Sequence, residues 1–280
     1  MAAPTFADAA IADNRRMDPT ALPDCDGLHR LMLPGGRRAV CKRRHDAPAG
    51  FFAAEARGLQ ALGATGGLRV PQVFAVGDDH ILLEDLGAGT PAADFATRAG
   101  IGLARQHSHV GPHFGFSHSG WCGDSPQDNT PDDDGHRFFA QRRLLPQAIR
   151  ARNTGRLSER ELSYIESLCT RLPELIPAQP PVLLHGDLWT GNLHCDAHGA
   201  PALIDAGSVH HGWAEAELAM LTLFGSPPPA LFDTYAAHAP LDRRWRERAP
   251  LYNLYHLLNH LNLFGGSYAD GVHSVLVRFA

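Results

Sequence analysis

Three polar residues in the second half of the chain have the types and spacing needed to handle a proton and a divalent cation. Asp187 and Asn192 lie five residues apart in the run HGDLWTGN at residues 185–192, and Asp205 follows 18 residues after Asp187. A carboxylate can accept the proton of an attacking hydroxyl, and carboxylate and amide oxygens are ligands that Mg²⁺ prefers. We therefore expect Asp187 to act as a catalytic base and Asn192 and Asp205 to hold Mg²⁺.

The order of these residues matches the catalytic-loop signature H-R-D-L-x-x-x-N of kinases. In such a loop the Asp orients the attacking hydroxyl, and the Asn at the far side reaches the cation that neutralises the phosphates of ATP. Asp205 begins Asp205-Ala206-Gly207, where protein kinases carry Asp-Phe-Gly. A surface loop with an Asx turn is the alternative for the first motif, and the Asp across the following hairpin argues against it.

Two further stretches could hold the nucleotide. Lys42 ends the run Ala-Val-Cys-Lys at residues 39–42, and Glu55 lies in a following helical pattern. This arrangement resembles the strand lysine of kinases and the helix glutamate that orients it, although Lys42 could also belong to a solvated basic run. The strand of residues 80–86 would end in the hinge that pairs with adenine, so Glu84, Asp85 and Leu86 are candidate ATP-binding residues.

The elements that must position these residues divide near residues 87–91. The first part predicts strands at 28–33, 38–42, 70–76 and 80–86, and a helix at 51–62 that Gly63 would stop. The second part predicts helices at 92–109, 134–152 and 158–176, a buried strand at 181–184, a hairpin of 193–195 with 201–204, and helices from 215 onward with a break at 227–229. Ser158 and Glu161 form a capping-box pattern.

This pattern predicts an α+β, protein-kinase-like fold with two lobes. Residues 1–87 would form a small, β-rich N-lobe that binds nucleotide, and residues 88–280 a larger, mainly helical C-lobe with the catalytic loop and the acceptor site. A cleft between two lobes is a natural place for a small ligand.

Composition excludes several other classes of protein. The formal charge of −5, with no basic stripe, disfavours binding to a nucleic acid. No run of about 18 apolar residues and no signal-peptide pattern is present, so we expect no membrane span. Five scattered cysteines without a C-x-x-C pair indicate reduced thiols and a cytoplasmic protein. A monomer is expected rather than an oligomer.

Two other patterns in the sequence have simpler explanations. Residues 87–92 read G-x-G-x-x-A, but no acidic residue follows where a dinucleotide site needs one, so the glycines are better explained as a turn between lobes. His256 and His260 lie four apart and could bind zinc, yet no Glu lies between them in the order H-E-x-x-H. No histidine cluster brings a Cys or a carboxylate at ligand spacing, so packed helix histidines are the expectation.

Taken together, these motifs resemble the fructosamine kinase (ketosamine kinase) family, which is related to the aminoglycoside and choline kinases. The resemblance covers nearly the whole chain from about Arg38. Besides the catalytic loop, the matching segments are 114–116, 123–129, 138–146, 215–220, 223–225, 240–241 and 251–266.

The resemblance implies an ATP- and Mg²⁺-dependent transfer of phosphate to a sugar hydroxyl of a ketoamine, of the fructosamine or ribulosamine type. In the family this phosphorylation makes the adduct labile and so recovers the amine, a deglycation repair. It also implies that Asp187 is the base, that Asn192 and Asp205 are metal ligands, and that Trp189 and Trp121 border the acceptor pocket, where an indole face can stack on a sugar or a protonated amine.

The chain departs from the family pattern at three places. The Gly-rich nucleotide loop is reduced to Asp24-Cys25-Asp26-Gly27-Leu28, Ala214 replaces an Arg, and Glu217 replaces an Asp that braces the catalytic loop. Two alternatives therefore stay open: a kinase of the same fold for another small acceptor, such as an aminoglycoside or an amino alcohol, and a nucleotide-binding module without catalysis.

Overall fold

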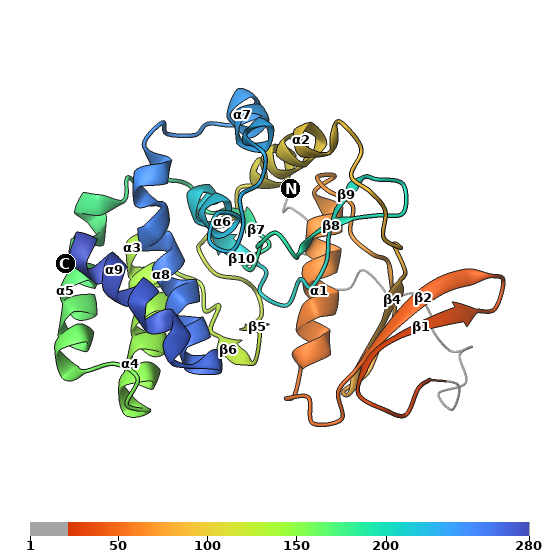
Figure 1. The fold of residues 1–280 in the computed structure, drawn as a ribbon, viewed down its shortest axis with the longest axis horizontal. Coiled ribbons are helices and arrows are strands. Elements are labelled where there is room, and N and C mark those ends of the chain that lie inside the picture. Colours follow the sequence, from red (N-terminus) through yellow and green to blue (C-terminus); the bar gives the residue numbers. More distant parts are fainter. Residues whose placement is uncertain (1–21, 280) are drawn as a thin grey trace, which may run out of the picture.

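The N-terminal part of the chain folds into a sheet with one helix beside it. The computed structural model describes residues 22–279. Its four antiparallel strands lie in the order β1-β2-β4-β3, with the helix α1 beside them (Figure 1). The elements are β1 (Gly27–Leu33), β2 (Arg37–Arg43), α1 (Phe51–Ala64), β3 (Val73–Val76) and β4 (His80–Glu84).

The apolar pattern of these segments explains how they pack. In β4, Ile81 and Leu83 join the large core beneath α1, while Leu82 lies in a small cluster with Leu33 and Cys41, as side chains alternate along a strand. The tight turn between β1 and β2 uses Gly35 and Gly36 at positive φ, as the Pro-Gly-Gly signal predicts. Gly63 does not stop α1, which continues to Ala64, so the predicted end of the helix at residue 62 was two residues too early.

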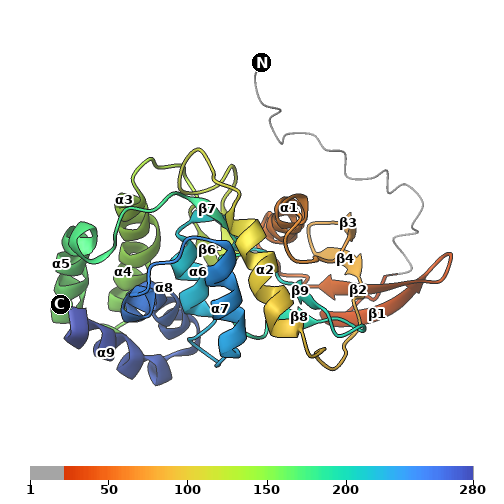
Figure 2. The same cartoon turned by 90° about the horizontal axis from the view of Figure 1, so that it is seen from above.

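The rest of the described chain is mainly helical, with three small two-stranded sheets (Figures 1 and 2). In chain order the elements are α2 (Phe95–His107), β5 (Gly120–Cys122), β6 (Ser125–Gln127), α3 (Gly135–Phe139), η2 (Ala140–Leu144), α4 (Leu145–Asn153), α5 (Glu159–Leu175), β7 (Val182–Leu184), β8 (Leu193–Cys195), β9 (Pro201–Leu203), β10 (His210–Gly212), α6 (Ala214–Met220), α7 (Pro229–His238), α8 (Trp245–Phe264), η3 (Gly266–Tyr268) and α9 (Ala269–Phe279). The predicted α+β, kinase-like fold with a strand-rich N-terminal and a helical C-terminal region is confirmed.

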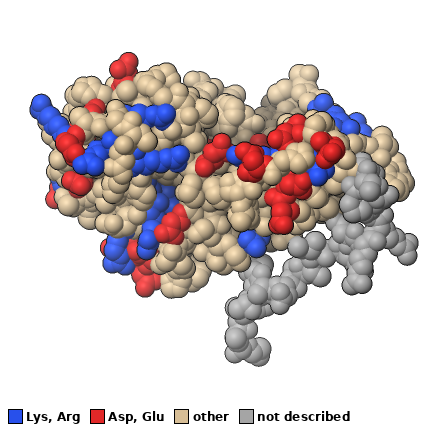
Figure 3. Space-filling model, turned by 90° about the horizontal axis from the view of Figure 1, so that it is seen from below, with Lys and Arg blue, Asp and Glu red and all other residues tan. Residues whose placement is uncertain are grey.

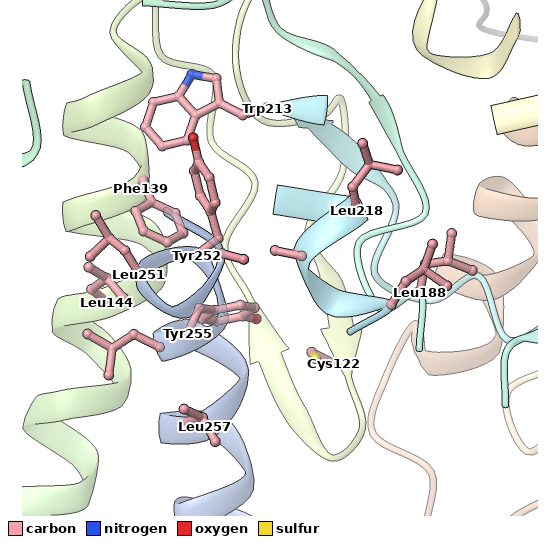
Figure 4. Close-up of a cluster of buried hydrophobic side chains, with 14 of the residues drawn as sticks. Cys122, Phe139, Leu144, Leu188, Trp213, Leu218, Leu251, Tyr252, Tyr255 and Leu257 are labelled. Carbon is pink, nitrogen blue, oxygen red and sulfur yellow. The ribbon is translucent and has the colours of Figure 1, made fainter. Parts of the chain in front are cut away.

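Helix α8 is the centre of the helical region. Leu251, Leu254, Leu258 and Leu261 are fully buried on it, and Figure 4 shows its Leu251, Tyr252, Tyr255 and Leu257 among side chains from α6, β5 and the α3–α4 segment. Its asparagines are also buried and donate to backbone carbonyls: Asn253 to Ala219, Asn259 to Cys122 and Asn262 to Gln147. The polar residues of this helix therefore attach it to neighbouring elements.

Several predicted elements differ in detail from the structure. The helix expected at 134–152 is α3 and α4 joined by the π-helical turn η2. The β5–β6 hairpin and the strand β10 were not predicted, and each strand has only three residues. The predicted boundary at residue 87 stays a proposal; it falls just after β4, and its N-lobe includes residues 1–21, which lie outside the described part.

The segment after β4 connects the two regions. The carbonyl of Leu86 accepts a hydrogen bond from the Ala197 amide at 2.9 Å, and the Gly89 amide donates to the Cys195 carbonyl at 3.3 Å. Gly87 has a φ of +68°, which a glycine adopts without strain. The β8–β9 hairpin, which follows the loop of residues 185–192, is thereby joined to the end of the N-terminal sheet (Figure 2).

The distribution of charge on the surface and the hydropathy of the helices agree with what the amino-acid composition indicates. Figure 3 shows one face on which acidic side chains gather on the side of the N-terminal sheet and basic ones on the helical side, without a continuous basic surface. Between residues 22 and 279, no helix has both the length and the hydropathy that crossing a membrane would require.

Candidate active site

The run 185–192 forms the loop between β7 and β8, as predicted. Its conformation depends on Gly186, which has a φ of +83° and on which a Cβ would overlap the carbonyl oxygen of Ser208. The buried ring of His185 is hydrogen-bonded to the carbonyl of Ile204 at 2.8 Å. These contacts fix the two residues that precede Asp187.

Glu217 of α6 braces this loop from behind. Its carboxylate accepts hydrogen bonds from the amides of His185 (3.0 Å) and Gly186 (2.8 Å), and from the side chains of Gln106 (3.0 Å) and His107 (3.2 Å). Burial alone would raise the pKa of Glu217, but the hydrogen bond and charge of His107 and the backbone amide hold it below its usual value. The longer Glu thus makes the bracing contacts that the resemblance assigns to an Asp.

Asp187 lies in an apolar, partly enclosed environment. Burial, and then the negative charge of Glu217, raise the pKa of Asp187 to about 7. Its side chain keeps 22% of its exposure, and one carboxylate oxygen lies 3.8 Å from Nδ1 of His256. A base whose pKa lies near neutral pH is well suited to accept a proton from a hydroxyl and release it again.

Asn192 and Asp205 have oxygens suited to a Mg²⁺ ion. The Nδ2 of Asn192 donates to the carbonyl of Asp187 at 2.8 Å, and within residues 22–279 its side-chain oxygen accepts no hydrogen bond. Asp205 has a φ of 60° and is the one non-glycine residue of the described part with a positive φ. Because such a conformation is uncommon outside functional sites and turns, it supports a specific task for the Asp205 carboxylate. The donor set, one amide and one carboxylate oxygen, fits the ion.

Lys42 of β2 connects the sheet to this loop. Its Nζ lies 2.5 Å from a carboxylate oxygen of Glu55 on α1 and also contacts the carboxylate of Asp205. The predicted strand lysine, helix glutamate and cation ligand are therefore neighbours in space. In α1, Gly58 lies against the backbone of residue 206, where a Cβ would overlap the carbonyl oxygen of Ala206.

The three predicted hinge residues have structural partners for their side chains or carbonyls. Glu84 is paired with Arg69 at 2.5 Å, and Asp85 accepts from the Gly87 amide at 2.8 Å. Leu86 is buried and its carbonyl is bonded to Ala197. Only backbone groups of this segment, such as the Leu86 amide, are then suited to pair with adenine, and that contact stays a prediction.

The two predicted tryptophans have different surroundings. Trp189, 39% exposed, follows Asp187 by two residues, and its ring occupies the place that a Cβ on Gly191 would take. Trp121 of β5 packs against Phe51 with ring centroids 5.8 Å apart and donates its amide to the Gly207 carbonyl at 2.9 Å. Trp121 therefore supports the Asp205 loop, while the ring of Trp189 is open to a ligand.

The two acidic residues of the reduced Gly-rich segment interact with the side chain of His45. Asp26 accepts hydrogen bonds from the amide and Nδ1 of His45, and Asp24 lies 3.4 Å from Nε2 of the same ring. The Asp26 hydrogen bond, then Asp24, raise the pKa of His45. These acids are therefore partly neutralised by a histidine.

Sequence reasoning missed several residues around Asp187. Gln106 and His107 come from α2, Cys122 from β5 and His256 from α8, and none stands in a recognisable motif. In the structure Cys122, Asp187 and His256 lie together, a cluster that the spacing of these residues in the sequence could not indicate.

Known proteins with similar sequences and folds are consistent with this geometry. A family model described as fructosamine kinase matches residues 23–279. A probable ketoamine kinase of Enterococcus faecium is 36% identical over 237 residues, 82% of this chain and 83% of that protein, and one of Thermus thermophilus is 34% identical over 270 residues, 90% of this chain and 96% of that protein.

Solved structures extend the similarity to the fold. A candidate fructosamine-3-kinase from Thermobifida fusca superposes with a TM-score of 0.83 at 36% identity, covering 90% of this chain and 89% of that one. An ADP-bound aminoglycoside phosphotransferase gives a TM-score of 0.58 at 15% identity, covering 91% and 90%. At that identity the second match supports the fold alone.

Proposed function

This chain belongs to the fructosamine kinase family, and on that premise we propose that it transfers the γ-phosphoryl group of ATP to a sugar hydroxyl of a ketoamine. The observation that carries the proposal is the convergence of Lys42, Glu55 and Asp205 beside a loop that presents Asp187. A binding module without catalysis would not need a partly buried, near-neutral carboxylate in that loop.

The proposed reaction needs few covalent changes. The acceptor hydroxyl oxygen bonds to the γ-phosphorus, the bond from that phosphorus to the β–γ bridging oxygen breaks, and ADP leaves. Asp187 receives the proton of the hydroxyl. Lys42, held by Glu55, would bind the phosphates of ATP, and Trp189 would form one wall for the sugar or its amine.

Asn192 and Asp205 would hold Mg²⁺, and when bound the ion neutralises phosphate charge. The Asn192 side chain is fixed by its bond to the Asp187 carbonyl, so the same contact that orients the metal ligand also orients the base. Lys42 contacts Asp205 directly, which sets the phosphate-binding side chain beside the cation ligand.

We further propose a role in deglycation, because relatives of this chain include several proteins named probable ketoamine kinases. Phosphorylation of the sugar would make the adduct labile and return the free amine. The five cysteines are free thiols, which suits the reducing cytoplasm that we propose as the compartment. We propose that the enzyme acts as a monomer.

The experiment that tests the proposal measures ADP release by the pure protein with Mg²⁺ and ATP, with and without a ribulosamine such as ribuloselysine. Asp187→Asn should lower the acceptor-dependent turnover by about 10²- to 10⁴-fold, the weight of a general base, while ATP affinity stays nearly unchanged. An aminoglycoside and an amino alcohol serve as comparison acceptors.

Each outcome is informative. Release of ADP that needs the ribulosamine and vanishes in Asp187→Asn supports the ketoamine kinase. ADP release only with the aminoglycoside or the amino alcohol would assign the activity to that class of acceptor. ATP binding without any turnover supports the non-catalytic module, and absence of ATP binding refutes the kinase altogether.

A further inference from the structure

Three side chains that could ligate a metal meet at the catalytic base. Cys122 ends β5, Asp187 lies in the loop after β7, and His256 lies in the middle of α8. The sulfur, a carboxylate oxygen and a ring nitrogen all lie within 4.8 Å of one another. A thiolate, a carboxylate and an imidazole form a donor set that suits zinc and not the oxygen-seeking Mg²⁺.

His256 is oriented toward this cluster and has no other partner there. Its side chain is 8% exposed, and its buried Nδ1 makes no hydrogen bond with any residue from 22 to 279. The same nitrogen lies 3.8 Å from the Asp187 carboxylate. A buried polar atom without a partner costs free energy, so its presence beside two other ligand atoms calls for a ligand.

The sulfur of Cys122 has a polar neighbour that suits a bound thiolate. Asn259, one turn after His256 on α8, donates its Nδ2 to this sulfur at 3.3 Å and to the Cys122 carbonyl at 3.1 Å. Such a donor stabilises a metal-bound sulfur and fixes its orientation. Figure 4 shows Cys122 on the β-hairpin beside α8, and apolar side chains enclose it on the inner side.

Metal binding would change the protonation of the cluster. Burial raises the pKa of the Cys122 thiol, so a zinc ion would have to displace its proton to be bound by the thiolate. Arg143 of η2 is the opposing buried cation, held by the carbonyl of Asp128 and the side chain of Asn129. The negative charge that ligation would leave on Cys122 and Asp187 would then be balanced by the Zn²⁺ ion.

We propose that Cys122, Asp187 and His256 form a zinc site that inhibits the enzyme when occupied. Zinc–ligand bonds of about 2.0–2.3 Å require the three ligand atoms to lie closer together than they do in this cluster. Side-chain rotations that move these atoms by about 1 Å can bring them within range. The Asp187 side chain is 22% exposed, so an ion can reach the cluster from the solvent past this side chain. Zinc binding stands by itself; only its inhibitory effect depends on the proposed function.

Direct binding is tested with Co²⁺ as a spectroscopic substitute for zinc. Titrated into the pure, reduced protein, Co²⁺ should produce a near-ultraviolet sulfur-to-cobalt charge-transfer band that zinc abolishes. The band should be absent from Cys122→Ser and from Cys122→Ala. Cys169→Ser, which changes a thiol on the distant helix α5, is the matched control and should keep it.

Inhibition is tested with free Zn²⁺ buffered by a chelator in the presence of excess Mg²⁺ and ATP. With the activity of each variant expressed relative to its own activity without zinc, the zinc concentration for half inhibition should rise by at least about tenfold in Cys122→Ser and should not change in Cys169→Ser. A wild-type protein without the cobalt band, or equal zinc inhibition in Cys122→Ser, overturns the proposal. If no acceptor is phosphorylated at all, the proposed function fails while the cobalt band still decides the metal site.

Discussion

At the scale of single residues, the proposed chemistry depends on two carboxylates with opposite environments, Asp187 and Glu217. Glu217 is fully supplied with hydrogen-bond donors, whereas Asp187 is partly desolvated and lies in the field of Glu217. Because like charges oppose each other's ionisation, the bracing residue also sets the pH at which the base is ready. One side chain therefore acts on both the shape and the protonation of the loop.

Glu217→Gln should separate these two effects. The proposed mechanism needs ionised Asp187, so kcat/KM of the wild type should fall as the pH drops below about 7. Removing the charge of Glu217 lowers the pKa of Asp187, so this acid limb should move to lower pH. The amide nitrogen of Gln would face the backbone N–H donors of the loop and repel them. The resulting misplacement of Asp187 should lower kcat by about 10- to 100-fold.

A pH profile of kcat/KM checks this prediction. Glu215→Gln, on the same helix but bonded to Arg248 and Tyr252, is the control and should leave the limb in place. An unshifted limb in Glu217→Gln would mean that another group governs the acid side of the profile.

The raised pKa of Asp187 also predicts a cost in stability. A carboxyl whose pKa is higher in the folded state favours folding fully only below its unfolded value near 4, and that contribution is lost as the pH rises through about 7. Asp187→Asn should therefore match the wild type near pH 4 and exceed it by up to about 4 kcal/mol above pH 7, the value of about three pKa units. Urea unfolding at both pH values measures this; a constant difference would show that the effect is not ionisation.

How far the sequence predicts such residues depends on whether they share a motif. Asp187, Asn192 and Asp205 lie within one short stretch of sequence. Their spacing predicts a loop followed by a hairpin, and the structure has the loop between β7 and β8 and then the β8–β9 hairpin. Cys122 and His256 are 134 residues apart in the sequence, and they meet at Asp187 only because β5 and α8 pack together. Local periodicity carries no information on such a contact.

At the scale of elements, α1 must approach the Asp205 loop closely for the site to form. Gly58 lies against the carbonyl of Ala206, one turn after Glu55, which holds Lys42. The missing side chain thus sets the distance between the helix that orients the lysine and the loop that carries the cation ligand. The helix pattern alone would have tolerated Ala at this position.

Gly58→Ala should consequently weaken ATP use despite the better helix propensity of Ala. The added Cβ would push α1 away from the Asp205 loop, and overpacking of this kind costs about 1–3 kcal/mol. We expect a higher KM for ATP, a lower kcat and a lower Tm. Gln60→Ala, on the exposed side of the same helix, is the control and should change none of these. Unaltered kinetics in Gly58→Ala would show that the helix can move without consequence.

Element prediction succeeded where local signals were strong. The capping box of Ser158 and Glu161 begins α5 as expected, with both reciprocal hydrogen bonds present. The three-residue strands β5, β6 and β10 have no periodicity long enough to detect, and they pair because tertiary packing brings them together. The π-turn at 140–144 places Arg143 in the core, a buried cation that a regular helix pattern would not predict.

At the scale of the whole molecule, the two regions meet through charged and polar contacts at the site itself. Lys42 of the sheet contacts Asp205 of the helical region, and Arg44 after β2 pairs with Asp124 of the β5–β6 turn at 2.5 Å. The backbone bond from Ala197 to Leu86 fixes the connecting segment. Nucleotide bound at Lys42 and Asp205 would contact both regions at once and should stabilise them together.

Mg²⁺ with ATP should therefore raise the Tm of the protein in a way that requires Asp205. At 100 times the Kd, a ligand specific for the folded state adds about 2.7 kcal/mol, which for a domain of this size corresponds to about 5–10 °C. Asp205→Asn keeps a residue type that tolerates the positive φ but loses the charge that holds the cation, so the increment that Mg²⁺ adds to ATP alone should disappear. Asp270→Asn, an exposed carboxylate on α9, should retain it. Thermal unfolding with ATP, with and without Mg²⁺, measures the difference, and a magnesium-dependent increment that survives in Asp205→Asn would place the cation on other ligands.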